Sequence, residues 1–470
     1  MNIGVIVIGV LFAVLAIVLW LNKSFVETLK NIWKIEDLRM KLGVTMLFIL
    51  IYRFGSFIVL PGINPDALAS LKQALGAQTD SGLMSLLNMF SGGAFSNASI
   101  FALGIMPYIS ASIVVQLLGV AVPYFQKIQK EGESGRRKLN QITRYLTVGI
   151  LLVQGPSYLV NLNAQLHQVG GIALGFWFNL SSTLILCAGS MFVMWLGERM
   201  TDKGIGNGIS MLIMIGIIAR FLPSVAQEFS ARVAGNGGGG LVMFLVEIVI
   251  FLLVIAAAIL LVQGTRKIPV QYAKRVVGNK QYGGVRQYLP LKVNAAGVMP
   301  IIFAQAIMMV PVMFAFGGEA KPFLRAITDT AGFTHNFILA VLIIAFTYLY
   351  TAITFNPTQM AEEMKRNNGF IPGVKPGKQT GEYIDTIMSR IVLPGSIFLA
   401  FIAIMPAFAR YFGITSGFSQ FFGGTSLLIL VGVVLDTLQQ IESHLLMRHY
   451  DGLLKSGGRI KGRSGSMAAY

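Results

Sequence analysis

Residues that commonly carry out chemistry, such as histidine, cysteine and the carboxylates, are few in this chain and widely spaced. None of the four histidines has a partner at the spacing of metal ligands; they are His167, His335, His444 and His449. The single cysteine, Cys187, can form neither an intramolecular disulfide nor a cysteine metal site. The chain contains no GxxxxGK(S/T), HExxH or GxSxG motif. We therefore predict that the protein is not an enzyme and has no catalytic residue, metal or cofactor.

Ionisable residues inside apolar runs usually mark ion pathways or proton relays. Three are visible here, and they lie far apart in the sequence: Arg53, Glu247 and Asp436. Arg53 can reach outward to the interface or bond to neighbours inside a helix bundle. Because the three charges have no obvious pairing, a proton pathway is weakly supported. An ion-coupled secondary transporter and an intramembrane enzyme are therefore only the alternatives.

Apolar runs long enough to cross a bilayer recur through the whole chain. Of its 470 residues, 54% are hydrophobic and 12% are charged, whereas a soluble domain carries about 25% charged residues. Since a spanning helix needs about 20 mostly apolar residues, we predict a polytopic membrane protein. The ten predicted spans are Val44–Leu60, Ile100–Val120, Tyr145–Val160, Phe176–Leu196, Ile205–Leu222, Leu241–Val262, Ala295–Phe316, Phe337–Phe355, Ile391–Phe408 and Ser426–Gln440.

Positive charge is concentrated in alternate loops. The formal net charge is +17, and Lys and Arg gather after the second, sixth and eighth spans and in the C-terminal tail. The loops Asn161–Gly171 and Pro223–Gly240 are nearly free of them. Because short basic loops stay in the cytoplasm, we predict that the ten spans begin and end there. The loop after the sixth span has seven cations and no acid, which suits RNA phosphates or an acidic protein face, or only enforces topology.

Two segments precede the first predicted span. The apolar run Ile3–Leu21 has the length of a signal-like segment or of an extra span with its N-terminus outside, and we favour the extra span. Ser24–Lys41 places apolar residues at helical spacing among charged ones. This pattern predicts an amphipathic helix on the cytoplasmic interface, and the alternative is a solvated linker.

Several long strings of residues are typical of one protein family. They include YRFGSFIVLPGI (52–63), KEGESGRRK (130–138), WLGERMTDKGIGNGIS (195–210) and FNPTQMAEEMKRNNGFIPGVKPGKQT (355–380). Together and in order, from about Ile35 to the C-terminus, they resemble the SecY family, the channel subunits of bacterial Sec protein translocases.

The resemblance implies an all-α polytopic fold, a ten-helix clamshell of two pseudo-symmetric five-helix halves around an hourglass pore. Unfolded secretory polypeptides would cross the membrane through it, and transmembrane segments would leave sideways into lipid. The expected units are 1–22 for the extra N-terminal hydrophobic helix (or a misassigned start), 23–41 for the amphipathic helix, 42–225 for the N-terminal half with a plug at 81–95, 226–446 for the C-terminal half and 447–470 for a basic cytoplasmic tail. The expected location is the bacterial cytoplasmic (inner) membrane, with a cytoplasmic C-terminus.

The span Phe101–Leu118 resembles the pore-lining half of helix two in this family. It carries Pro107, Ser110 and Gln116, which lipid does not favour. Polar groups and irregular backbone at membrane depth are tolerated where they line a cavity. We therefore expect one face of this helix to meet an aqueous pore, with a bend at Pro107.

The pore constriction in this family is a ring of aliphatic side chains. By motif it maps to six isoleucines: Ile105, Ile109, Ile209, Ile213, Ile302 and Ile429. Ile105 and Ile109, like Ile209 and Ile213, are four residues apart and so share a helix face. A ring of branched apolar groups can exclude ions by dewetting and yet part for a polypeptide.

The resemblance also assigns a plug and a lateral gate between helices two and seven. The plug residues are Met89, Phe90, Ser91, Gly92 and Gly93, where glycine suits a hinge that must move. The gate residues are Ser110, Asn294 and Val310. Buried Ser and Asn can hydrogen-bond across helices, for about 1 kcal/mol or less each, and so hold the gate shut.

Docking sites for the ribosome and the SecA motor ATPase are implied in the basic loops. They map to Arg266, Lys267, Lys274, Arg275, Arg286 and Lys375. Lys375 stands where the family usually has arginine, and lysine lacks the planar fork of the guanidinium group. The other implied partners are the SecE and SecG subunits, signal-sequence-bearing polypeptides and membrane lipids.

Overall fold

Helices account for nearly all of the regular structure. The computed structural model describes residues 35–63, 88, 91–168, 175–234, 240–272, 275–277, 280–282, 286–294, 296–315 and 332–455. The first helices are α3 (Glu36–Gly55), α6 (Met106–Ala121), α7 (Pro123–Lys130), α8 (Glu133–Gln168), α9 (Phe176–Lys203) and α10 (Gly208–Val233). They are followed by α11 (Gly240–Gln263), α12 (Met299–Ala315), α14 (Phe333–Thr354), α15 (Pro357–Arg366), α16 (Lys378–Tyr411), α17 (Ser416–Ser419) and α18 (Gly424–Lys455).

Each of the ten predicted spans falls on one of these helices. Within the described ranges, six helical segments are long and apolar enough to cross a membrane by themselves. The helices α6 and α7 meet at a bend of 101° and make a seventh only if the two are counted together as one broken span. The prediction of an all-α polytopic architecture is therefore confirmed. The segment Ile3–Leu21 lies outside the described residues.

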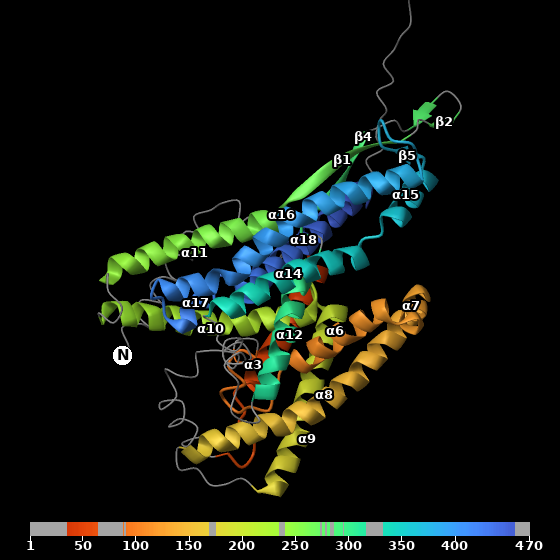
Figure 1. Ribbon diagram of the computed structural model, residues 1–470. Helices are drawn as coiled ribbons and strands as arrows, with labels where there is room; N and C mark the ends of the chain where they lie inside the picture. The colour runs from red at the N-terminus through yellow and green to blue at the C-terminus, as the bar shows by residue number, and fades with distance from the viewer. Residues whose placement is uncertain are drawn as a thin grey trace, which may run out of the picture.

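The helices pack in two groups that share α10 (Figure 1). In the first, α8 contacts α6 and α9, and α3 contacts α9. In the second, α14 lies against α12 and α16, and α18 lies against α11 and α16. The helix α10 packs on α3 and α9 as well as on α11 and α18. Any rearrangement between the two groups must therefore involve the contacts of α10.

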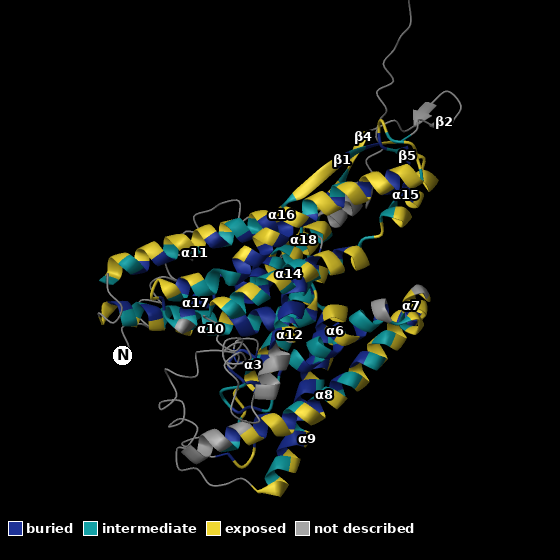
Figure 2. Ribbon diagram, viewed as in Figure 1, coloured by how far each residue is buried: buried dark blue, intermediate teal, exposed yellow. Residues whose placement is uncertain are grey.

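Exposed residues run along the outer side of α11 and of other long helices (Figure 2), and many of them are large and apolar. Leu253 and Leu260 of α11 are 65% and 73% exposed, whereas Ala258 on the same helix is fully buried. A helix that is apolar all round is typical of a membrane span with one face on its neighbours. This pattern agrees with a lipid-facing surface along α11.

The second predicted span differs from the structure. Residues 101–105 form turns, and the helix α6 begins only at Met106. Pro107 lies in the first turn, where its missing N–H breaks no helical hydrogen bond. The expectation that Pro107 bends a helix running through Phe101–Leu118 is wrong, because the proline starts the helix.

Several predicted boundaries are also shifted. A loop was predicted at Pro223–Gly240, but its first part, up to Val233, is helical. The helix α10 continues through Pro223 to that residue, so this part of the prediction is wrong. The helix α8 likewise runs to Gln168, inside the predicted loop Asn161–Gly171. The helix α3 shows no break at the expected boundary after residue 41, and α18 extends into the expected tail as far as Lys455.

A small sheet follows α11 where a basic loop is predicted. Strand β1 (Thr265–Tyr272) pairs antiparallel with β4 (Arg286–Lys292) and with β5 (Gly369–Phe370), in the order β4-β1-β5. Between β1 and β4, strands β2 (Arg275–Val277) and β3 (Lys280–Tyr282) form a second hairpin. The buried side chains of Ile268, Val270 and Leu291 pack on α15 and α16 residues such as Met364 and Met388. This core fixes the sheet at one end of the helix bundle.

Candidate functional site

The six predicted ring isoleucines lie in one apolar cluster. They come from four separate places in the chain, namely the start of α6, the start of α10, α12 and α18. Ile105, Ile213 and Ile429 are 4%, 5% and 4% exposed, and the other three are partly buried against them. The spacing of the residues could place two isoleucines on one face of a single helix. That all six lie together across several helices is a result of the tertiary structure.

The part of the predicted plug that the structure describes, residues 88 and 91–95 (the plug segment), packs against the same cluster. Ala94 is fully buried in it. Gly92 has a φ of +64°, and a Cβ atom there would lie 2.9 Å from the Cα atom of Gly216 on α10. Only glycine combines this left-handed conformation with so close a backbone approach. The predicted plug residues Met89 and Phe90 lie outside the described residues.

Three side chains anchor the plug segment through its backbone carbonyl groups. The hydroxyl group of Tyr52 donates to the carbonyl oxygen of Ser91 at 3.4 Å. The Nη1 atom of Arg53 donates to the carbonyl oxygen of Gly92 at 3.1 Å, and its guanidinium carbon lies 5.3 Å from the centre of the Phe57 ring. Of the two outcomes predicted for Arg53, the bond inside the bundle is therefore the one observed.

A third anchor comes from α8. The hydroxyl group of Tyr158 donates to the carbonyl oxygen of Phe95 at 2.8 Å, and the two rings are in contact, with centroids 4.7 Å apart. Sequence reasoning did not single out Tyr52 or Tyr158. A buried tyrosine needs a hydrogen-bond partner, but only the fold shows that the partner is the plug backbone.

The predicted gate residues lie on the expected elements. Ser110 lies on α6, Asn294 lies in the turn before α12, and Val310 lies on α12. Among the described side chains, no hydrogen bond joins Ser110 to Asn294. The gate therefore stays a prediction.

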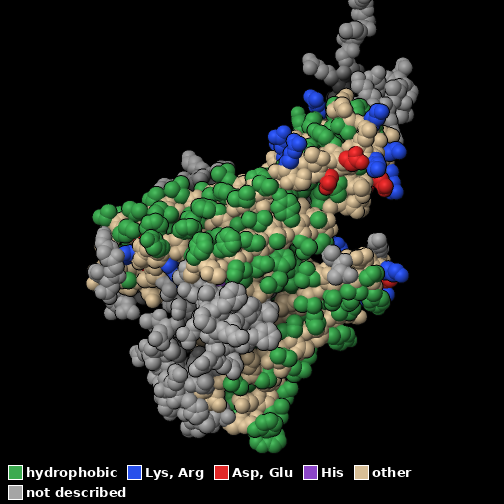
Figure 3. Space-filling view, in the orientation of Figure 1, with side chains coloured by type: hydrophobic (Ala, Val, Ile, Leu, Met, Phe, Trp, Pro, Cys, Tyr) green, Lys and Arg blue, Asp and Glu red, His purple; other side chains and the backbone are tan. Residues whose placement is uncertain are grey.

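The sheet brings the two predicted docking loops together. Arg266 and Lys267 are exposed on β1, and Arg286 is exposed on the adjacent strand β4. Lys375 is exposed in the turn that follows β5, which pairs with the other edge of β1. Lys274 and the side chain of Arg275 lie outside the described residues. Figure 3 shows Lys and Arg gathered at this end of the molecule and at the corner near α7, and apolar side chains over the helices between.

The expectation that Glu247 has no pairing is wrong. Glu247 forms a buried ion pair with Arg232, which also pairs with Glu228. Arg232 and Glu228 were missed because the sequence assigned them to a loop. Their spacing of four residues, which places an acid and a base on one helix face, was the available signal.

Comparison with known proteins decides the family. A sequence model of SecY matches residues 99–438. The protein translocase subunit SecY of Streptomyces scabiei is 42% identical over 436 residues, which cover 90% of this chain and 98% of the relative. The chain belongs to the SecY family. It is therefore a multi-pass membrane protein that functions as a protein-translocation channel.

Solved structures of the family share the fold of this SecY-family chain. One is a SecY protein whose plug domain is described as stabilising the closed state of the translocation channel; it has a TM-score of 0.60 and 17% identity, and covers 90% of this chain and 95% of that one. Sec61 from a canine ribosome–channel complex has a TM-score of 0.54 and 16% identity, with the same coverage. At these identities the likeness concerns the fold, which confirms the SecY-type architecture predicted from the sequence motifs.

Proposed function

We propose that unfolded polypeptides cross the membrane through a pore whose seal is the ring of six isoleucines. The observation that supports this most directly is that all six isoleucines, from four helices, lie in one apolar cluster with Ala94 of the plug segment. Such a seal contains no charged group and no specific hydrogen bond. It can therefore exclude ions at rest by dewetting and part for a passing chain of any sequence.

The plug and the gate complete the proposed cycle. The plug segment covers the ring at rest, held by Tyr52, Arg53 and Tyr158. When a signal sequence separates α6 from α12, at Ser110, Asn294 and Val310, the plug moves and the ring opens. An apolar segment in the pore can then leave between these two helices into lipid.

The basic sheet is the proposed docking surface for the cytoplasmic partners. Its exposed Arg266, Lys267 and Arg286 can bind ribosomal RNA phosphates or an acidic face of a motor protein. Sec61 is named in a ribosome–channel complex, which supports the ribosome as a partner here. The family resemblance adds SecA, SecE and SecG. By the positive-inside rule this end of the bundle, with the C-terminus, is cytoplasmic.

Site-directed crosslinking tests the pore. In a Cys187→Ser background, Ile109→Cys or Ile302→Cys is combined with a stalled secretory polypeptide that carries one cysteine. We expect both positions to crosslink to it. Leu253→Cys on α11, 65% exposed on the outer surface, is the control and should not crosslink. A chain that crosses the membrane without crosslinking to either isoleucine position would show that the pore lies elsewhere.

Ion conductance tests the seal separately. Replacing Ile105, Ile213 and Ile429 together with glycine removes three side chains of the ring. The resting conductance of the channel in planar bilayers should rise, because the dry constriction becomes wide enough for water. Unchanged conductance in a correctly inserted variant would contradict the ring assignment. A secondary transporter would instead be recognised by substrate-dependent currents.

A further inference from the structure

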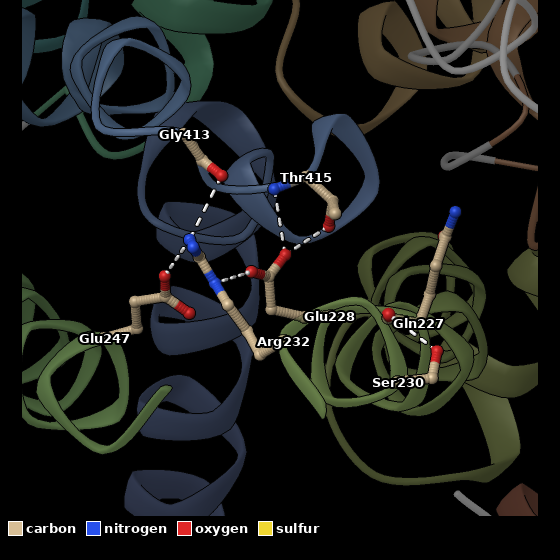
Figure 4. Close-up of polar contacts among 7 residues, drawn as sticks. All are labelled: Gln227, Glu228, Ser230, Arg232, Glu247, Gly413 and Thr415. Atoms are coloured by element: carbon tan, nitrogen blue, oxygen red, sulfur yellow. Dashed lines mark hydrogen bonds and ion pairs between the residues drawn. The ribbon is translucent and has the colours of Figure 1, made fainter. Parts of the chain in front are cut away.

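A buried ion cluster joins three elements at the end of the bundle opposite the basic sheet (Figure 4). The Nε atom of Arg232 on α10 donates to Oε1 of Glu228 at 2.9 Å. Its Nη2 atom donates to Oε1 of Glu247 on α11 and, at 3.0 Å, to the carbonyl oxygen of Gly413. Oε2 of Glu228 accepts from the backbone N–H of Thr415, at 2.8 Å, and from its hydroxyl group. One guanidinium group therefore ties α10 to α11 and to the turn between α16 and α17.

Burial makes this cluster depend on its geometry. The side chains of Glu228, Arg232 and Glu247 are each 1–2% exposed. A buried charge is tolerated only when its partners are in place, and removing one partner leaves the other charge uncompensated. The cluster is consequently either intact or broken. A small displacement of α10 from α11 or from the Gly413–Thr415 turn is strongly unfavourable.

A continuous stripe of side chains along α10 leads from the isoleucine ring to the ion cluster. From the ring toward the ion cluster, the stripe consists of Ile213, Ile217, Phe221, Val225, Glu228 and Arg232, at intervals of three or four residues. Successive residues at this spacing are neighbours on the helix surface. Because α10 is one helix from Gly208 to Val233, with Pro223 inside it, a displacement at Arg232 is carried along the helix toward the ring.

Aromatic rings fill the space between the ion cluster and the ring. The centroid of Phe251 on α11, four residues after Glu247, lies 5.7 Å from that of Phe221 on α10 and 5.8 Å from that of Phe418 on α17. The ring centroids of Phe221 and Phe421 are 5.2 Å apart. Phe221, Phe251 and Phe421 also pack in the apolar cluster that holds the six isoleucines. The packing from Arg232 to the ring is thus continuous.

The other end of α10 is also tied to α18, which carries Ile429. The backbone N–H of Gly206, just before α10, donates to Oε1 of Gln440 on α18 at 2.9 Å. The ion cluster makes the matching connection at the far end, through the turn that leads by α17 into α18. Two helices that carry ring residues are therefore held together on both sides of the ring.

We propose that Arg232, with Glu228 and Glu247, is a clamp that keeps the isoleucine ring closed at rest. These are positioning residues, which act on the ring through α10 and the aromatic layer. The clamp holds α10, with Ile209 and Ile213, against α11 and against the turn that leads to α18. This inference rests on the proposed function of the ring.

The test compares resting conductances of the full chain in planar bilayers. Arg232→Met removes the bonds of Arg232 to Glu228, Glu247 and Gly413, and we expect the resting conductance to rise about tenfold, which corresponds to ~1.4 kcal/mol. Arg232→Lys and Glu247→Gln should give smaller increases. The ammonium group keeps the charge but lacks the planar fork that spans the three acceptors, and Glu247→Gln affects only the bond between Glu247 and Arg232. The matched control is Arg144→Met, which breaks the ion pair of Arg144 with Glu198 between α8 and α9. Its conductance should not change.

A second readout separates positioning from a general loss of stability. Ile213, which is 5% exposed, is replaced by cysteine in a Cys187→Ser background. Its modification by a water-soluble thiol reagent should become faster when Arg232→Met is added, and not when Arg144→Met is added. A variant that only unfolds more easily would lower the Tm without this difference between the two arginines.

Each outcome decides the proposal. If the resting conductance rises in the glycine variant of the ring but not in the Arg232 and Glu247 variants, the clamp is wrong and the ring assignment stands. If the resting conductance of the glycine variant is unchanged, the ring assignment fails, and the clamp fails with it. If Arg232→Met does not insert, Arg232→Lys and Glu247→Gln decide, and unchanged conductance in both overturns the clamp. An equal rise in Arg144→Met also overturns it.

Discussion

Arg53 on α3 donates a hydrogen bond to the carbonyl oxygen of Gly92, 3.1 Å away, and so joins the first span to the plug segment. The adjacent Tyr52 donates to Ser91. Both acceptors are backbone groups, so the anchor holds the path of the chain and does not depend on the plug side chains. A segment held in this way can be released without breaking an ion pair.

Removing the Arg53 anchor should loosen the plug. We expect Arg53→Met to raise the resting conductance, because a hydrogen bond from a charged group contributes about 1.5–3 kcal/mol. Arg199→Met is the control: Arg199 also lies over an aromatic ring, that of Trp195 at 5.8 Å, but on α9. Planar-bilayer recordings measure both. Equal conductance in the two variants would show that Arg53 does not hold the plug.

A methyl group at Gly92 should disturb the closed plug. In Gly92→Ala the left-handed backbone costs about 1–2 kcal/mol, and the added Cβ atom would approach the backbone of Gly216 to 2.9 Å. Gly132→Ala is the matched control, because Gly132 also has a positive φ, +72°, but no atom lies within 4 Å of its Cβ position. We expect higher conductance only in Gly92→Ala. An equal rise in conductance in both variants would show that backbone strain, and not the contact with Gly216, is the cause.

Close packing of α9 against the turns before α6 should limit substitution at Gly189. A Cβ atom there would lie 2.3 Å from the carbonyl oxygen of Ile100. Overpacking of this kind costs about 1–3 kcal/mol, so Gly189→Ala should lower the Tm in detergent. Gly149→Ala on α8 meets no atom within 4 Å and should keep or raise the Tm, because alanine favours a helix by up to about 1 kcal/mol. The opposite order would refute this packing.

Charge reversal on the sheet should weaken docking. Arg266→Glu combined with Lys267→Glu is expected to weaken ribosome or SecA binding roughly tenfold, or ~1.4 kcal/mol. The loss should be larger at low salt, because exposed charges are screened. Lys203→Glu, exposed at the end of α9 and outside the sheet, is the control. Binding assays at two salt concentrations measure the effect, and equal binding in all three proteins would leave this loop a role in topology alone.

Much of the fold was predictable from local patterns. Long apolar runs located the helices, because a bilayer requires about 20 apolar residues per span. The boundaries were less predictable. Residues 101–105 are apolar enough to read as part of a span, but they form turns beside the plug, and Pro223 lies inside α10 although proline usually ends a helix. In both cases tertiary packing determined the backbone conformation.

The candidate site divides in the same way. The family motifs identified the six isoleucines, the plug glycines and the basic loops by residue type and order. The anchors of the plug, Tyr52, Arg53 and Tyr158, bond to carbonyl groups 39–63 residues away in the sequence. Backbone acceptors leave no mark in a sequence.

The sequence by itself determined that this chain spans a membrane repeatedly and which family it resembles, and it predicted six isoleucines as a constriction. Only the tertiary structure decided that Arg232 pairs with Glu228 and Glu247, and that two basic loops share one sheet. The physical reason is that hydrophobic periodicity is a local property of the chain, whereas the pairing of buried charges and strands depends on which distant segments the packing brings into contact.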